Sequence, residues 1–174
     1  MSKIAVIVGS PSDASRLYGL VDAAVRRLIG GGHEVDTLRV TDLPPDDLIY
    51  ARFDSPAVRN AAERVARADA VVVASQVYKA SYTGVLKTFL DLLPQKGLSS
   101  KAVFPLFVGG TMAHFLSIDY ALKPVLSSMG ARTVFTGVYA LDSQIARTAD
   151  GAFQLQDDLQ ARLDASLDEF LAIL

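Results

Sequence analysis

The chain has 174 residues, 51% of them hydrophobic and 21% charged, a balance typical of a globular protein long enough to bury a core. Its formal net charge of −2 argues against a nucleic-acid partner, because binding to phosphates needs a cationic surface. It contains no cysteine, which excludes disulfides and thiolate metal sites and agrees with a cytoplasmic location, and no segment approaches the ~20 apolar residues that cross a membrane.

The first third of the chain predicts two strands and a helix between them. Residues 4–8 are almost wholly apolar, as in a strand buried on both faces, and are too few for the core of a signal peptide. Apolar residues at helical spacing predict a helix over residues 14–29, which the glycines at 30–32 end. A weaker strand is predicted over residues 34–40, followed by the turn-rich stretch TDLPPDDLIYARFD.

The middle of the chain repeats this alternation. The pair Ser55-Pro56 is typical of a helix start and predicts a helix over residues 56–68. The apolar run at 70–74 predicts a buried strand. A helix is predicted over residues 84–93, because Pro94 cannot continue it.

The last third predicts two more strands and two more helices. Residues 102–108 and 133–140 read as strands, and residues 115–129 and 155–174 as helices. A proline inside the first of these helices removes a backbone hydrogen bond, so we expect a kink or bulge near Tyr120–Pro124.

This alternation predicts an α/β fold of the flavodoxin-like kind, a three-layer sandwich around a five-stranded parallel sheet in the order 2-1-3-4-5. We expect residues 1–174 to form a single domain, since no linker, repeat or low-complexity segment interrupts the pattern. In such a fold the ligand crevice lies beyond the carboxyl ends of the strands, between the first and third strands.

The stretch GSPSDASR follows the first strand and offers donors for an anion. Hydroxyl groups and one guanidinium come from Ser10, Ser12, Ser15 and Arg16, beside a helix start. The stretch lacks the GxGxxG of a pyrophosphate site and the Gly-Lys-Ser of a P-loop, so it suits one terminal phosphate. The alternative is that Ser12 or Asp13 only caps the helix.

The loops after the third and fourth strands add a surface for a planar ring. Tyr78 and Tyr82 would stack on such a ring, with ordinary packing of loop tyrosines as the alternative. Gly109-Gly110 forms a plain turn or lets backbone amides approach the polar edge of a ring. Phosphate donors, a stacking surface and backbone amides together suggest a mononucleotide with a large planar base, and FMN fits well.

Other chemistries have little support in the sequence. The two histidines, His33 and His114, lie at no metal-ligand spacing, so no metal is expected. The GSPS sequence is not a GxSxG nucleophile elbow. Since a bound flavin would carry out the redox chemistry itself, no catalytic side chain is obligatory.

Four stretches resemble the NAD(P)H-dependent FMN reductase family, most closely the FMN reductases of alkanesulfonate assimilation in two-component monooxygenase systems. They are YARFDSPAV, VYKASYTGVLKTFLDLLP, GGTMAHFLSIDYALKPVLS and DSQ. The resemblance implies a flavodoxin-like fold and hydride transfer from NAD(P)H to FMN, with reduced flavin passed to a monooxygenase. It also implies homo-oligomers, dimers or tetramers, with FMN near a subunit interface.

By motif position, the resemblance implies a set of binding residues. Ser10, Ser15 and Arg16 would bind the phosphate. The flavin ring would be lined by Val77, Tyr78, Lys79 and Ala80. Its pyrimidine edge would contact Gly109, Gly110 and Thr111. Lys79 is also a candidate contact for NAD(P)H, with a solvated surface lysine as the alternative. Tyr120 takes the position of a tyrosine that lies, in some members, in a π-helix at the oligomer interface.

The chain departs from the family pattern at two expected binding residues. Ser12 stands where the family has an arginine, and Gln76 where the second loop usually opens with proline. Loss of a guanidinium removes a bidentate phosphate partner, so either Arg16 compensates or FMN is held weakly, as a substrate would be.

Two other functions stay open at the level of sequence. One is a flavoenzyme that retains FMN and reduces quinones, azo compounds or metal oxyanions, and the other is a non-catalytic FMN-binding electron carrier. The choice between NADPH and NADH is open as well.

Overall fold

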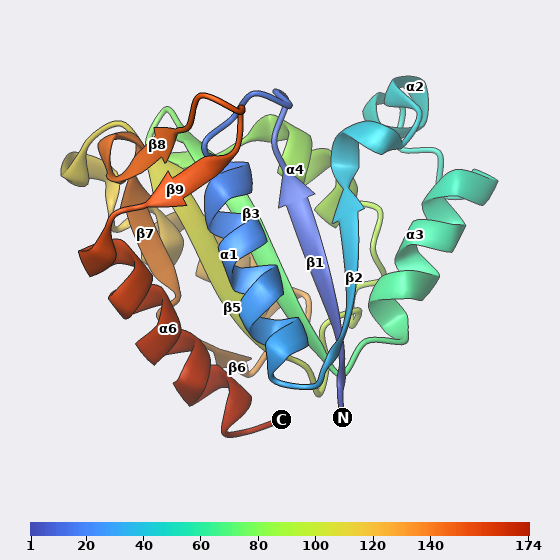
Figure 1. Cartoon of the computed structure of the whole chain (residues 1–174). Helices are drawn as coiled ribbons and strands as arrows, with labels where there is room; N and C mark the ends of the chain where they lie inside the picture. Colours follow the sequence, from blue (N-terminus) through green and yellow to red (C-terminus); the bar gives the residue numbers. More distant parts are fainter.

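The computed structural model describes all of residues 1–174 and has one main sheet with helices on both faces (Figure 1). The strands run in the order β2-β1-β3-β5-β6, and every neighbouring pair along this path is parallel. Two further strands join it, β7 parallel to β5 and β4 antiparallel to β3. The bounds are β1 Lys3–Gly9, β2 Glu34–Arg39, β3 Ala70–Tyr78, β4 Ser81–Tyr82, β5 Ala102–Gly109, β6 Thr133–Val134 and β7 Val138–Leu141.

Helices form the two outer layers. Their bounds are α1 Leu17–Gly30, α2 Pro45–Ile49, α3 Pro56–Ala66, α4 Gly84–Leu90, α5 Lys123–Ser128 and α6 Asp157–Leu171. The helices α1 and α6 lie side by side against one face of the sheet (Figure 1), and α3, α4 and α5 pack against the other. The predicted α/β, flavodoxin-like three-layer arrangement is therefore confirmed.

The middle parts of the central strands are apolar because both of their faces are buried. Ile4, Val6 and Val8 of β1 point into the core beneath α1 and α6, while Ala5 and Ile7 point into the core on the opposite face. This alternation is the period of two expected of a strand. It places the carboxyl ends of β1, β3 and β5 next to one another at one edge of the sheet.

The prediction of five uninterrupted parallel strands is wrong, because the fifth strand is split into β6 and β7. Its register against β5 advances by one residue between the two pieces: Val103 pairs with Val134, but Leu106 pairs with Val138. The extra residue is a bulge. Gly137 lies in it with φ +71°, and a Cβ there would overlap the Pro105 carbonyl.

A small hairpin was missed by the sequence analysis. The strands β8 (Ile145–Arg147) and β9 (Phe153–Leu155) form an antiparallel pair. Leu155, predicted to begin the last helix, ends β9 instead, and α6 begins at Asp157. The hairpin packs over α1 at Gly19, where a Cβ would crowd the Phe153 side chain. The short helix α2 was also missed, within the turn-rich stretch.

The expected irregularity near Pro124 is confirmed. Residues Ile118–Leu122 form a π-helix, and α5 continues from Lys123 with Pro124 in its first turn. The predicted helix over residues 115–129 is thus a π-helical segment that runs directly into a short α-helix. Proline has no backbone N–H, and the N–H groups in the first turn of a helix have no acceptor within that helix. Pro124 therefore fits in the first turn of α5.

Candidate functional site

Three loops meet at the carboxyl edge of the sheet. They follow β1, β3 and β5, which are adjacent, and Gly9 of β1 lies opposite Ser75 of β3. Thr83, at the start of α4, ties two of these segments together, because its hydroxyl donates to the Gly9 carbonyl at 2.5 Å. Since a Cβ at Gly9 would overlap Leu86, glycine is needed for this close approach.

The loop after β1 is shaped by its own serines. The buried Ser10 hydroxyl donates to the Ser12 carbonyl at 2.8 Å and accepts from the Ser12 N–H at 3.2 Å, so it fixes the turn rather than facing solvent. Ser15 Oγ accepts from the Leu17 N–H at 3.1 Å. Neither Ser12 nor Asp13 caps α1, because Ser12 Oγ accepts from Ala14 and Asp13 pairs with Arg39.

The predicted helix over residues 14–29 accordingly starts later, at Leu17. Ala14, Ser15 and Arg16 stay in the loop, where the Ser12 carbonyl accepts from the Ser15 N–H at 3.2 Å. This leaves the Asp13 and Arg16 N–H groups without an acceptor in the chain. An anion at this point would meet two free backbone donors and a helix start.

The other two loops present free backbone donors in the same way. The N–H groups of Lys79 and Ala80, in the turn between β3 and β4, donate no hydrogen bond within the chain, nor do those of Gly110 and Thr111 after β5. Each of the three loops thus holds at least two unpaired donors at one edge of the sheet. Unpaired backbone donors at the protein surface are suited to oxygen and nitrogen acceptors of a ligand.

The turn between β3 and β4 has an unusual backbone. Val77 pairs with Tyr82 and Tyr78 with Ser81, which leaves a two-residue turn in which Lys79 and Ala80 have φ of +51° and +62°. Positive φ at both positions is the geometry of a type I′ hairpin turn, and it strains residues other than glycine or asparagine.

The two tyrosines of this hairpin have different surroundings. Tyr82 is half-buried and packs against the core, and this burial raises the pKa of its hydroxyl. Ordinary packing therefore accounts for Tyr82. Tyr78 is 51% exposed, so its ring lies at the surface beside the strained turn and is free to contact a ligand.

Gln76 links the loops after β1 and β3. Its Nε2 donates to Ser15 Oγ at 2.6 Å, while its buried Oε1 has no partner. If the amide turns by half a rotation, Ser15 donates to Oε1 and Nε2 becomes a donor facing the first loop. The chain thus holds a side-chain amide beside Ser15.

The third loop is shaped by a residue that the sequence analysis missed. The Tyr139 hydroxyl donates to the Thr111 carbonyl at 2.7 Å, and its ring fills the space in which a Cβ of Gly109 would stand. Burial raises the pKa of this tyrosine. Gly110 is open, because a Cβ there would meet only Asp142 Oδ2 at 3.9 Å. The sequence signal that could have indicated this contact is a single tyrosine in an apolar strand, opposite the two glycines at the end of the neighbouring strand.

Arg16 does not point into the first loop. Its Nε donates to the Ile145 carbonyl at 2.9 Å, which turns the guanidinium toward the β8–β9 hairpin. The loop itself therefore contains no free cationic side chain, because its other neighbour, Arg39, pairs with Asp13 and lies 3.6 Å from Asp42.

An exposed apolar surface adjoins the third loop. Tyr120, in the π-helix, is 79% exposed, and three apolar side chains precede it at the surface, namely Met112, Phe115 and Leu116. The π-helix packs against β4, so this surface borders the hairpin that carries Tyr78. Contiguous exposed apolar groups of this kind mark interaction surfaces.

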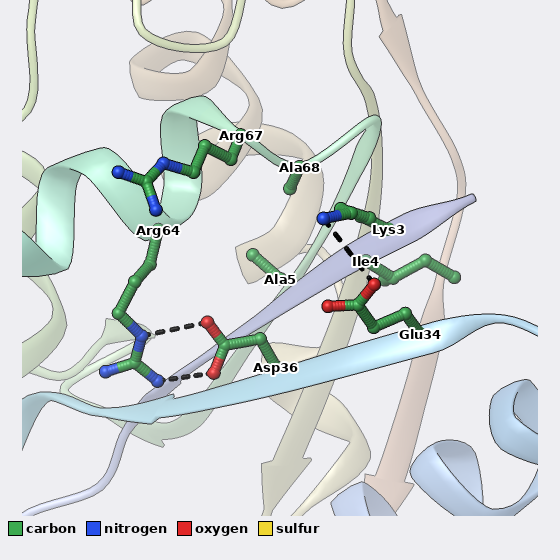
Figure 2. Close-up of a pocket in the computed structure, with 8 residues that line it drawn as sticks. All are labelled: Lys3, Ile4, Ala5, Glu34, Asp36, Arg64, Arg67 and Ala68. Carbon is green, nitrogen blue, oxygen red and sulfur yellow. Dashed lines mark hydrogen bonds and ion pairs between the residues drawn. The ribbon is translucent and has the colours of Figure 1, made fainter.

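A cleft lined by charged side chains lies on another part of the sheet. This cleft of about 150 Å³ lies between β1, β2 and α3. Figure 2 shows Arg64 turned toward Asp36 and Lys3 turned toward Glu34. Arg64 donates to both carboxylate oxygens of Asp36, at 2.8 and 2.6 Å, and Lys3 lies 3.6 Å from Glu34. These mutual pairs leave little charge for a ligand.

The histidines do not form a metal site. His33 Nδ1 accepts from the Ser2 N–H at 3.3 Å, away from the three loops. No group of three or more His, Cys, Asp or Glu side chains could hold a metal ion. None of the helices combines the length and apolarity needed to span a membrane.

Comparison with known proteins agrees with this architecture. The model of the NADPH-dependent FMN reductase family matches residues 2–146. The chain is 45% identical to an FMN reductase (NADPH) of Escherichia coli over 97% of its length and 87% of the relative's. It is 48% identical to an FMN reductase (NADPH) of Pseudomonas putida, over 94% and 84%.

Solved structures match as well. The apo form of an NADH:FMN oxidoreductase (EMOB) superimposes with a TM-score of 0.90 at 36% identity, covering 100% of this chain and 90% of that one. A flavodoxin of Streptococcus pneumoniae has a TM-score of 0.68 over 99% of this chain and 100% of that one, and at 16% identity it shows the fold alone. Family model, relatives and fold agree, and the chain belongs to the NADPH-dependent FMN reductase family.

Proposed function

We propose that this protein transfers a hydride from NAD(P)H to FMN and releases the reduced flavin to a partner monooxygenase. The observation that carries the proposal is the set of unpaired backbone N–H groups, at least two in each of the loops after β1, β3 and β5. A flavin mononucleotide has acceptors spaced along its length, from the phosphate to the pyrimidine edge. The family membership of the chain agrees with FMN and NADPH as its substrates.

Each loop has a separate task in this proposal. Asp13 and Arg16 would donate backbone N–H groups to the phosphate, and the amide of Gln76 would stand beside it. Tyr78 would cover one side of the ring. Gly110 and Thr111 would donate to the pyrimidine edge, where negative charge grows when the flavin is reduced.

The flavin supplies the hydride acceptor when it is bound, and the protein orients it. The Tyr139 hydroxyl fixes the third loop by holding the Thr111 carbonyl, so the free N–H groups keep their direction. No side chain in the three loops is placed as an acid or base for the transfer, and none is required.

Release of the product is favoured by the absence of a cation inside the first loop. Ser12 is exposed and uncharged, and Arg39 is neutralised by Asp13 and Asp42. Within the loop itself, the phosphate would meet backbone donors but no bidentate contact from an arginine side chain. The protein would thus bind and release FMN as a substrate.

The exposed apolar surface around Tyr120 supports a homo-oligomer, dimer or tetramer. A side chain that is 79% exposed on a π-helix would gain by burial against a second copy. Its position beside the β3–β4 hairpin would place such an interface near the flavin. A cytoplasmic location remains a prediction.

One experiment separates this function from its alternatives. The purified protein is gel-filtered and assayed for NADPH and NADH oxidation with and without excess FMN. The proposal expects a nearly colourless protein whose activity depends on added FMN. A yellow protein that needs no added flavin and reduces quinones would indicate retained FMN, and no oxidation under any condition would indicate an electron carrier.

A further inference from the structure

A cleft of about 160 Å³ lies between the start of α1 and the β8–β9 hairpin. Ala14, Arg16, Arg147 and Phe153 line it. It adjoins the loop after β1, since Ala14 and Arg16 belong to both. In Figure 1 the hairpin lies over the beginning of α1, close to this loop. Two arginines from distant parts of the chain thus share one small cleft.

Both guanidinium groups are held by neutral partners. Arg16 Nε donates to the Ile145 carbonyl at 2.9 Å. Arg147 Nη2 donates to the Ala14 carbonyl at 3.3 Å, and its guanidinium carbon lies 5.2 Å from the centre of the Phe153 ring. Backbone carbonyls and an aromatic face fix the direction of an arginine without cancelling its charge.

The charge of this cleft is uncompensated within the chain. No carboxylate lies within 4.0 Å of either guanidinium, whereas Arg39, on the other side of the same loop, pairs with Asp13 and Asp42. Nine ion pairs occur in the protein, and neither Arg16 nor Arg147 takes part in one. Two oriented guanidinium groups with free Nη donors suit a dianion with several oxygens.

We propose that Arg147 and Arg16 form a clamp for a phosphate monoester at the entrance to the flavin site. This inference rests on the proposed function, both of whose substrates carry such a group: the 5′-phosphate of FMN and the 2′-phosphate of NADPH. Arg147, the hairpin's member of the clamp, lies one residue beyond the stretch 2–146 that the family model matches. Gly19 of α1 allows the hairpin to approach closely enough.

The test compares ligands that differ only in a phosphate. The protein is titrated with FMN and with riboflavin, each followed by flavin fluorescence, and with NADP⁺ and NAD⁺ as competitors. Arg147→Gln removes the charge and keeps much of the stem on Phe153. Arg147→Lys keeps the charge and loses the fork. Arg59→Gln, at an exposed α3 position without an ion pair, is the matched control.

We expect Arg147→Gln to weaken one phosphorylated ligand about tenfold and its unphosphorylated counterpart hardly at all, because a charge-assisted contact is lost. If affinity is lost for FMN but not for riboflavin, the clamp binds the 5′-phosphate of FMN. If affinity is lost for NADP⁺ but not for NAD⁺, the clamp binds the 2′-phosphate. The lysine variant should fall between, and Arg59→Gln should bind all four ligands as the natural protein does.

Equal affinities of the natural protein and both Arg147 variants for all four ligands would overturn the clamp. So would a loss of the same size for the phosphorylated and unphosphorylated members of a pair, because that indicates a structural role for the hairpin. Failure of the proposed function looks different, since the natural protein itself would then show no NAD(P)H oxidation that depends on added FMN. Circular dichroism of each variant, with Arg147→Lys as the milder change, checks that the hairpin stays folded.

Discussion

Among single residues, Ser12 is the position where a substitution is expected to strengthen flavin binding. It is exposed in the loop after β1, and its backbone is already held by Ser10. An arginine side chain at this position would add a bidentate donor for phosphate. Ser12→Arg is expected to lower the dissociation constant of FMN about tenfold, measured by quenching of flavin fluorescence.

Riboflavin is the control ligand for this substitution, since it has no phosphate. Its affinity should not change. An unaltered dissociation constant for FMN would mean that position 12 faces away from the phosphate.

The Asp36–Arg64 pair gives a prediction about acid stability. Hydrogen bonds from Arg64 hold the pKa of Asp36 below its usual value. The folded state therefore gains stability above the unfolded pKa of about 4 and loses that gain as the pH falls through the lower folded pKa. Because both side chains are about one-third to one-half exposed, the contribution is at most about 1 kcal/mol.

Asp36→Asn should thus lower the free energy of unfolding at pH 7 and leave it nearly unchanged at about pH 2, as measured by urea titration. Asp46→Asn, at an exposed position with no ion pair, serves as the control. An equal loss for Asp36→Asn at both pH values would contradict an ionic contribution.

For single residues, the sequence indicated which side chains lie at the carboxyl edge of the sheet but not the direction in which each side chain points. Small hydroxyl residues after the first and third strands could be expected at one edge, since parallel strands end together. The inward turn of Ser10 and the rotation of Arg16 toward Ile145 depend on contacts with residues distant in sequence. Local patterns do not carry that information.

Among the elements, the β3–β4 hairpin has the clearest strain. Ala80 has φ +62°, a conformation that costs a non-glycine residue about 1 kcal/mol. Ala80→Gly should therefore raise the free energy of unfolding, or leave it unchanged once the greater entropy of glycine is included. Urea unfolding measures the difference.

A matched change elsewhere gives the opposite sign. Ala161 is exposed inside α6, where glycine should destabilise the protein by about 1 kcal/mol. Equal destabilisation by Ala80→Gly and Ala161→Gly would show that position 80 is not strained.

The positions of strands and helices could be predicted from the spacing of apolar residues where a whole segment, or one whole face of it, is buried. The apolar residues 4–8 of β1 and the buried parts of β3 and β5 are of this kind. The split of β6 from β7 arises from register against Pro105, and the β8–β9 hairpin from packing over Gly19, so both are tertiary effects. The helical spacing of leucines from Leu155 onward masked the short strand β9.

In the whole molecule, two cores on opposite faces of the sheet hold the layers together. Beneath α6, Phe170 lies 5.2 Å from Phe104 and 5.3 Å from Phe135, measured between ring centres. Phe170→Ala should lower the free energy of unfolding by about 3–5 kcal/mol, because it leaves a cavity among these rings.

The exposed Phe53 is the control for this change. Phe53→Ala should alter the free energy of unfolding by less than about 0.5 kcal/mol. Both variants are compared by urea unfolding with the slope of the transition checked for constancy. A small effect of Phe170→Ala would mean that α6 contributes little to global stability.

The unpaired donors of the three loops belong to the main chain, so replacing a side chain in these loops by alanine deletes none of them. A mutational scan would therefore understate the importance of the loops, and sequences could drift there while the chemistry persists. What must be preserved is the path of the backbone, which rests on Tyr139, Thr83 and the inward-turned Ser10.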